Sequence, residues 1–134
     1  MPQEFSVGVI VFNNDKFLLL KYKRGHWGFV KGIAEPNETK EEVANREAKE
    51  EAGLFDLFFV KGFEEKEEYF YKKDGQTIHK EVIYLLAETR MEYVKLSEEH
   101  VGFDWFNYED AMRRLSFKQT KDVLEKAQEF LRQK

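Results

Sequence analysis

Three glutamates between residues 46 and 53 have a spacing that would place their side chains together on a helix. In the run "REAKEEAG", Glu47, Glu50 and Glu51 stand at positions i, i+3 and i+4. Like charges at this spacing repel one another and weaken an isolated helix. Two interpretations account for them: a solvated helix face held by ion pairs, or a hard-oxygen site for Mg²⁺ or Mn²⁺. The spacing alone does not choose between them.

The residues around these glutamates predict a helix over residues 39–52. Thr39 and Glu42 have the spacing of a capping box, and Gly53 is placed to end the helix. We also expect Arg46 to pair with Glu42 and with Glu50, each four residues away along the chain.

A ridge of small residues accompanies the glutamates along the same predicted helix. Ala44, Ala48 and Ala52 recur every four residues, and we expect them on the side of the helix opposite Glu47 and Glu51. Such a ridge allows close packing against a sheet, which would hold the carboxylates in fixed positions.

The rest of the chain reads as strands with helices inserted between them. Hairpin signals occur at "NND" and at Asp74-Gly75, whereas the glycine-rich "RGHWGFVKG" is predicted to be a loop. The long strand over 77–89 is apolar on both faces at "VIYLLA", so we expect it at the centre of the sheet. Ser116 and Gln119 have capping-box spacing for the last helix. Strands are predicted over 4–12, 16–23, 54–62, 67–72, 77–89 and 102–106, and further helices over 108–115 and 117–132. This order predicts a mixed sheet between helices.

The composition limits the class of protein. A chain of 134 residues with 42% hydrophobic residues predicts a single domain, residues 1–134, with a real core. The net charge of −4 argues against a stable nucleic-acid partner. The sequence contains no cysteine, no long apolar run and no signal-peptide pattern at its start, so we expect a cytoplasmic protein without a membrane span.

The carboxylate helix belongs to a longer pattern. The run from Gly32 to Leu54, "GIAEPNETKEEVANREAKEEAGL", resembles the Nudix box, G-x5-E-x7-R-E-U-x-E-E-x-G-U, where U is a bulky aliphatic residue. The matching positions are Gly32, Glu38, Arg46, Glu47, Glu50, Glu51, Gly53 and Leu54. Ala48 is smaller than the usual U residue, and Asn37 replaces a glycine at a position that Asn can also occupy in a left-handed turn.

The resemblance implies an α/β/α sandwich and Mg²⁺-dependent hydrolysis of a nucleoside diphosphate linked to another group, with Mn²⁺ as an alternative ion. It implies metal ligands at Glu47, Glu50 and Glu51, joined by the Gly32 carbonyl. Arg46 would orient these carboxylates, and Glu38 would either bind a second ion or brace Arg46. Glu99 matches a glutamate that reaches the metal cluster in related hydrolases, so Glu51 and Glu99 are both candidates for the general base.

Further segments are similar to asymmetric diadenosine tetraphosphate hydrolases. "GHWGFVKG" resembles their W-x-F-P-K-G segment, with Val30 in place of proline, and "KEVIYLLAE" and "LSFKQTKDVL" resemble parts of their second half. Lys31 and Lys80 are the candidate phosphate contacts. Tyr84 shares a strand face with Lys80 and is either core or a substrate contact, and Phe117 is either core or a platform for adenine. His26 and His100 are candidates for phosphate binding, and neither has partners at the spacing of a zinc site.

The leading prediction is hydrolysis of diadenosine tetraphosphate to ATP and AMP by a monomer or a homodimer. A second prediction is another Nudix substrate: a nucleoside triphosphate, ADP-ribose or a triphosphorylated RNA end. A third is a nucleotide-binding regulator that uses the same fold without turnover. Phosphate release from a nucleotide panel, with and without Mg²⁺, separates the three.

Overall fold

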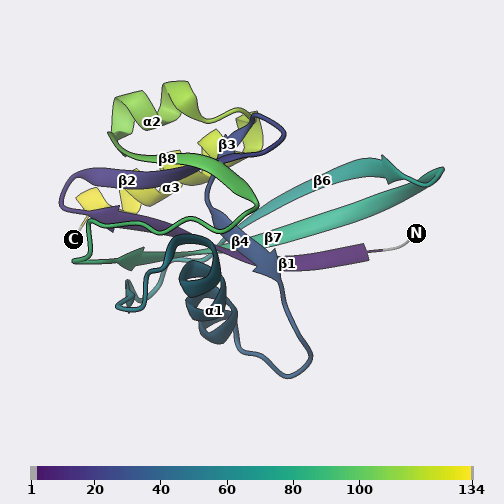
Figure 1. The fold of residues 1–134 in the computed structure, drawn as a ribbon, viewed down its shortest axis with the longest axis horizontal. Coiled ribbons are helices and arrows are strands. Elements are labelled where there is room, and N and C mark those ends of the chain that lie inside the picture. The colour runs from purple at the N-terminus through teal and green to yellow at the C-terminus, as the bar shows by residue number, and fades with distance from the viewer. Residues whose placement is uncertain (1–2, 134) are drawn as a thin grey trace.

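The computed structural model describes residues 3–133 and consists of one mixed sheet with helices on both faces (Figure 1). The strands are β1 (Gln3–Asn13), β2 (Lys16–Tyr22), β3 (Trp27–Gly28), β4 (Val30–Ile33), β5 (Phe58–Phe59), β6 (Glu65–Lys73), β7 (Gln76–Glu88) and β8 (His100–Asn107). The helices are α1 (Lys40–Ala52), α2 (Tyr108–Arg114) and α3 (Lys118–Arg132).

β1 and β7 lie side by side at the centre of the sheet. They pair in parallel over ten residues, from Gln3 opposite His79 to Phe12 opposite Glu88. β1 pairs with β4 and β2 on its other edge, while β6 forms a long antiparallel hairpin with β7. The central position predicted for the strand over 77–89 is therefore confirmed.

Two cores lie on the two faces of the sheet and confirm the predicted α/β/α sandwich. Val7, Val9 and Val11 of β1 pack with the alanines of α1 on one face. Ile10 of the same strand packs on the other face, with residues of α2 and α3 such as Leu124. Figure 1 shows α1 and α2 on opposite sides of the strands, with α3 behind them. Alternation of side chains along β1 thus supplies both cores.

Two predicted hairpin turns are confirmed by backbone angles. Asn13 pairs with Lys16, which leaves a two-residue loop that begins with Asn14 at φ 56°. Lys73 pairs with Gln76, and both loop residues between them, Asp74 and Gly75, have positive φ values of 52° and 76°. Positive φ at both loop positions matches the right-handed twist of the flanking strands.

Other local predictions were wrong. The strand predicted over 54–62 is reduced to the two residues of β5, because the ladder with β7 covers only Phe58 and Phe59. The glycine-rich segment predicted to be a loop contains β3 and most of β4. Their pairing partners are β2 and β1, and short strands of this kind depend on such partners rather than on local composition.

The predicted capping box of the last helix was also wrong. The N-cap of α3 is Phe117, which makes no side-chain capping bond. The hydroxyl of Ser116 instead accepts a hydrogen bond of 2.9 Å from the backbone N–H of Trp27. Ser116 therefore fastens the start of α3 to β3. No helix within residues 3–133 is both long and apolar enough to cross a membrane.

Candidate active site and metal centre

The N-terminal cap and C-terminal cap of α1 form as predicted. Thr39 and Glu42 make both bonds of the capping box, and Gly53 ends the helix at φ 69°. Asn37 also adopts a left-handed conformation, at φ 69°, as expected from its place in the Nudix box.

The predicted orientation of the alanine ridge was wrong. Ala44, Ala48 and Ala52 are fully buried, and Glu47 and Glu51 are buried beside them, at 9% and 5% exposure. A helix turns about 100° per residue, so each of these glutamates lies next to the alanine that follows it rather than opposite it. The ridge brings the carboxylates of Glu47 and Glu51 down onto the sheet.

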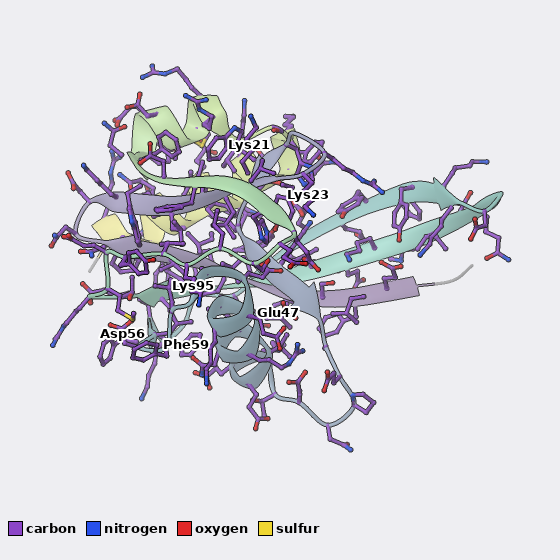
Figure 2. The ribbon with its side chains drawn as sticks, viewed as in Figure 1. Lys21, Lys23, Glu47, Asp56, Phe59 and Lys95 are labelled. Atoms are coloured by element: carbon purple, nitrogen blue, oxygen red, sulfur yellow. The ribbon has the colours of Figure 1, made fainter. Side chains whose placement is uncertain are left out.

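Gly32 on β4 makes room for the first of these carboxylates, that of Glu47. Glu47 is labelled beside α1 in Figure 2. A Cβ atom added to Gly32 would lie 2.0 Å from Cδ of Glu47 and 2.1 Å from its Oε1. Any other residue at this position would displace the carboxylate. The absence of a side chain at Gly32 therefore allows the β4 backbone and the Glu47 carboxylate to approach each other closely.

Arg46 connects the loop before α1 to the carboxylate cluster. Its Nε and Nη2 donate to the two carboxylate oxygens of Glu38, at 2.8 and 2.9 Å, and its Nη1 donates to Glu47 Oε1 at 2.8 Å. Nη2 also donates to the backbone carbonyl of Ile33. The guanidinium lowers the pKa of Glu38 to about 2, so Glu38 is ionised at neutral pH and holds Arg46 in place.

The predicted partners of Arg46 on its own helix are half right. Glu50 Oε2 lies 3.7 Å from Nη1 of Arg46, whereas Glu42 accepts from the backbone N–H of Thr39 in the capping box. The three predicted ligands therefore differ in their surroundings. Glu50 is 58% exposed and turned toward Arg46, while Glu47 and Glu51 are buried together.

Without a bound cation, burial and mutual repulsion disfavour the ionised form of the Glu47 and Glu51 carboxylates. Burial raises the pKa of Glu51 to about 9, with a further contribution from Glu47. Burial also raises the pKa of Glu47, against the opposing influence of Arg46. A divalent cation bound to hard carboxylate oxygens offsets both effects. The carboxylate oxygens of Glu47 and Glu51 therefore form a donor set that fits such an ion.

A second group of possible metal ligands lies on the hairpin. Among residues 3–133, Glu68, His79 and Glu81 are the three whose ligand atoms all lie within 4.8 Å of one another. Glu81 already has Lys66 as a partner at 3.8 Å. Exposed acidic groups often lie together without binding an ion, so we assign no metal to this group.

Lys31 links the carboxylates to the β6–β7 hairpin. Its backbone N–H donates to Glu51 Oε1 at 3.3 Å, and its Nζ lies 5.9 Å from the centre of the Tyr69 ring. Burial lowers the pKa of Lys31, and the negative charge of Glu67 opposes that shift. Lys80 faces Tyr69 directly across the hairpin and bonds to Glu4 at 3.3 Å. Both predicted phosphate contacts therefore lie close to the same tyrosine.

His26 and Phe117 form an aromatic group with Tyr22. The ring of His26 stacks on Tyr22 at 4.4 Å and lies 5.3 Å from the ring of Phe117. Phe117 is 52% exposed, so it is a surface side chain and not part of the core. An exposed ring at the start of α3, beside an imidazole, is suited to stacking a base.

His100, the first residue of β8, and Glu99, just before it, lie near the carboxylates. His100 Nε2 is buried, lacks a hydrogen-bond partner among the described residues, and lies 3.9 Å from Glu51 Oε1. Glu99 is exposed, and its charge contributes to the raised pKa of Glu51. Both residues are thus next to the candidate metal centre.

Tyr84 is a core residue. Its side chain is 1% exposed and packs edge-on against Phe29, with ring centres 5.8 Å apart. Its hydroxyl lies 3.5 Å from Glu67 Oε2. This burial contradicts the prediction that Tyr84 contacts the substrate, because a ligand cannot reach a fully buried side chain.

Two neighbours of the site were not predicted from the sequence. Tyr22 is held by a bond of 2.6 Å from its hydroxyl to the Phe29 carbonyl, and Tyr69 lies beneath Lys31. The Asp74-Gly75 turn contained a signal for Tyr69, because counting residues outward from that turn places Tyr69 opposite Lys80. Nothing in the local sequence around Tyr22 indicated its role.

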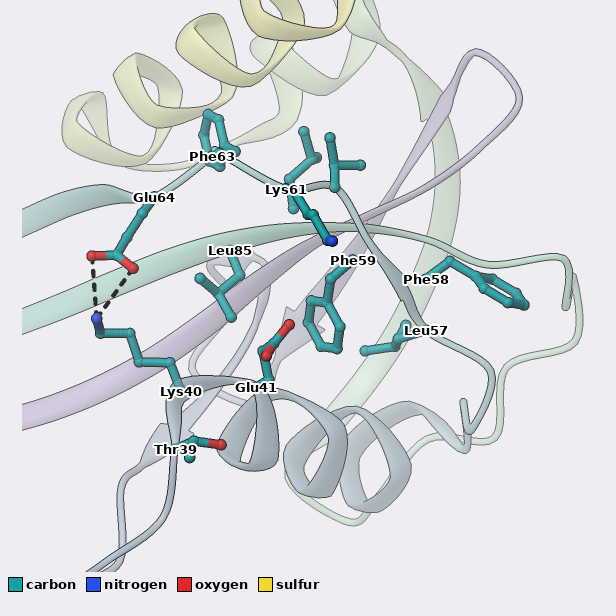
Figure 3. A pocket seen from close by; sticks show the side chains of 13 residues that line it. Thr39, Lys40, Glu41, Leu57, Phe58, Phe59, Lys61, Phe63, Glu64 and Leu85 are labelled. Atoms are coloured by element: carbon teal, nitrogen blue, oxygen red, sulfur yellow. Dashed lines mark hydrogen bonds and ion pairs between the residues drawn. The ribbon is translucent and has the colours of Figure 1, made fainter.

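A large pocket of the described structure lies elsewhere. It has a volume of about 820 Å³ and is lined by the start of α1, the segment before β6, and Leu85 and Leu86 (Figure 3). Lys40 and Glu64 form an ion pair of 3.1 Å at its edge. None of the predicted site residues lines it. The candidate active site is instead the open surface between α1, the hairpin and the start of α3.

Comparisons with known proteins agree with this geometry. Residues 2–128 match the model of the NUDIX domain. The asymmetrical bis(5'-nucleosyl)-tetraphosphatases of Sus scrofa and Mus musculus are 37% and 35% identical over 123 residues, covering 87% of this chain and 80% of theirs. A crystal structure of a binary complex of the C. elegans Ap4A hydrolase superposes with a TM-score of 0.84 at 29% identity, covering 98% of this chain and 99% of that one. The matched residues include Gly32, Glu47 and Glu51. The chain therefore belongs to the Nudix family.

Proposed function

We propose that residues 1–134 form one Nudix domain that hydrolyses diadenosine tetraphosphate asymmetrically, giving ATP and AMP. The observation that carries the proposal is the position of Lys31. Its backbone bonds to the buried carboxylate of Glu51, and its ammonium group lies over Tyr69 at the hairpin. Carboxylates for a cation, lysines for phosphates and exposed rings for a base therefore adjoin one another. The names of the relatives support the same substrate.

Glu47, Glu50 and Glu51 would hold the divalent cation that Nudix hydrolases use, beside the Gly32 backbone, and we propose Mg²⁺ with Mn²⁺ as the alternative. When bound, the cation supplies positive charge against the phosphates and lowers the pKa of a water molecule. The two bonds from Arg46 to Glu38 favour the bracing role of Glu38 over a second ion site.

The protein's own groups then have separate tasks. Glu51 or Glu99 accepts the proton of the attacking water, since both carboxylates adjoin the candidate metal centre. Lys31 and Lys80 stabilise charge on the phosphates, with help from His26. Phe117 stacks the adenine. A Glu99→Gln variant that binds Mn²⁺ normally but loses turnover would assign the base to Glu99.

The test is a panel of dinucleoside polyphosphates, nucleoside triphosphates and ADP-ribose, assayed with and without Mg²⁺. Diadenosine tetraphosphate should turn over fastest, and only with the cation. Faster turnover of a triphosphate or of ADP-ribose would reassign the substrate within the family. Nucleotide binding without turnover of any compound would support a regulator instead.

The site of attack is a sharper prediction. One carboxylate cluster and one adenine platform fix which phosphorus meets the water. We expect attack at the fourth phosphorus counted from the bound adenosine. The bond from this phosphorus to its bridging oxygen breaks, and that oxygen leaves with ATP. In ¹⁸O-labelled water, the label should appear in AMP and not in ATP. Two ADP molecules as the main product would refute the mechanism.

A further inference from the structure

A buried carboxylate outside the metal centre lies between the phosphate side and the adenine side of the proposed site. Glu67 on β6 is 4% exposed. Its Oε1 accepts a hydrogen bond of 2.7 Å from the hydroxyl of Thr120, and its Oε2 lies 3.5 Å from the hydroxyl of Tyr84. Burying a carboxylate is unfavourable unless it is bonded, so these partners explain how it is accommodated there.

The bond to Thr120 fixes the start of α3. Thr120 lies in the first turn of this helix, three residues after Phe117, which is its N-cap residue. Phe117 itself makes no side-chain capping bond. A carboxylate near the N-terminus of a helix is also favoured by the helix dipole. Glu67 is therefore one of the groups that hold the exposed ring of Phe117 at a set position relative to β6.

The same carboxylate acts on the phosphate side. Glu67 and Tyr69 are two residues apart on β6, so their side chains are on the same face of the strand. Lys31 lies over Tyr69 and interacts electrostatically with Glu67. The Glu67 side chain is thus bonded to the first turn of α3 and also acts electrostatically on Lys31.

We propose that Glu67 is a positioning residue that sets the distance between the phosphate contact Lys31 and the adenine platform Phe117. It acts through Thr120 and Lys31 and does not touch the substrate, because it is buried. The inference rests on the proposed function, since it assigns phosphate to Lys31 and a base to Phe117. Its chemistry applies to any nucleotide that spans these two residues.

Three variants test separately the two contacts through which Glu67 would act, the bond to Thr120 and the charge interaction with Lys31. Thr120→Val removes the hydroxyl donor at nearly constant volume, and Thr120→Ser restores it. Glu67→Gln keeps an oxygen acceptor for Thr120 but removes the negative charge that acts on Lys31. Thr77→Val is the matched control, because Thr77 lies on β7 on the face opposite Tyr84. The measurements are KM and kcat for diadenosine tetraphosphate, the inhibition constant of inorganic tripolyphosphate, and the thermal unfolding midpoint.

The expected results differ between the Thr120 variants and the Glu67 variant. Thr120→Val should raise KM about tenfold, equivalent to about 1.4 kcal/mol of binding. It should leave kcat and the tripolyphosphate constant within about twofold, because tripolyphosphate carries no base. Thr120→Ser should recover most of the KM. Glu67→Gln should weaken tripolyphosphate binding severalfold, since Lys31 loses its fixed counter-charge. Thr77→Val should change none of these values.

Several outcomes would overturn the proposal. A folded Thr120→Val protein with unchanged KM would do so, as would equal rises in KM and in the tripolyphosphate constant. If Thr120→Val does not fold, Glu67→Gln decides alone: unchanged tripolyphosphate binding in that variant refutes the role. Failure of the proposed function is seen separately, in the wild-type substrate panel, and the variants are then measured on whichever nucleotide turns over.

Discussion

At the scale of single residues, Gly32 is a position where the lack of a side chain leaves space for a carboxylate of the site, that of Glu47. In Gly32→Ala, the new Cβ would lie 2.0 Å from Cδ of Glu47, so the carboxylate must move away from β4. Displacing a supporting group of a metal site usually costs about 10–100-fold in affinity or activity. We expect a loss of this size in Mn²⁺ affinity, measured by calorimetry, and in turnover.

A matched control is available on β3. A Cβ added to Gly28 would meet its nearest neighbour, Cε2 of Tyr22, at 3.5 Å, which is ordinary contact. Gly28→Ala should therefore retain most of the activity. Normal Mn²⁺ affinity in Gly32→Ala would show that Glu47 is not a ligand in its observed position.

Glu51 gives the metal-free protein a pH dependence with a definite sign. Its pKa is raised from 4.5 to about 9 by burial and by Glu47. Between these values the folded protein keeps a proton that the unfolded chain has lost, so the free energy of unfolding falls as the pH rises. We expect denaturation in urea to show this decline from pH 6 to pH 9. Saturating Mg²⁺ should reduce this decline in stability.

The contribution of Glu51 is measured by comparing the wild type with the Glu51→Gln variant. Glu51→Gln lacks the titrating group, so its stability should decline less steeply over the same pH range. Parallel curves for the two metal-free proteins would contradict the raised pKa. If stability instead rises with pH in the wild type, and Glu51→Gln abolishes that rise, the pKa of Glu51 is lowered rather than raised.

At the scale of elements, the start of α3 decides the role of Phe117. Its side chain is 52% exposed, so Phe117→Ala removes little buried surface. We expect the unfolding midpoint to stay nearly unchanged. If the ring stacks adenine, binding should weaken by about 1–3 kcal/mol, seen as a higher KM. A large loss of stability with a normal KM would instead make Phe117 a structural residue.

The elements differ in how well the sequence predicted them. The caps of α1 could be predicted because Thr39, Glu42 and Gly53 act within their own helix. The start of α3 could not, because the partner of Ser116 is Trp27, 89 residues away. β3 and β4 were missed for the same reason: they are two and four residues long and depend on distant strands.

At the scale of the whole molecule, the Nudix pattern predicted the sandwich fold, and the proposed ligand set also rests on that pattern. The shape of the site could not be predicted from it. The parallel register of β1 and β7 places Glu4 beside Lys80 and determines which hairpin face adjoins Lys31. The burial of Tyr84 follows from the helices that cover the same face. Such placements depend on contacts between residues distant in the sequence, which strand periodicity alone does not specify.

The β6–β7 hairpin extends beyond the helices, as Figure 1 shows, and this should produce a gradient of amide hydrogen exchange along it. Near its tip, residues 72–77 lie past the last β1 partner, so their amides should exchange through small local openings. Amides around Val82 and Tyr84, at the covered end, should exchange only when the whole protein unfolds. Lys80 and Tyr69 lie between these limits. A bound dinucleotide that contacts them should therefore extend slow exchange toward the tip, which mass spectrometry of the two hairpin strands can measure. Protection confined to α1 would indicate that the substrate does not reach the hairpin.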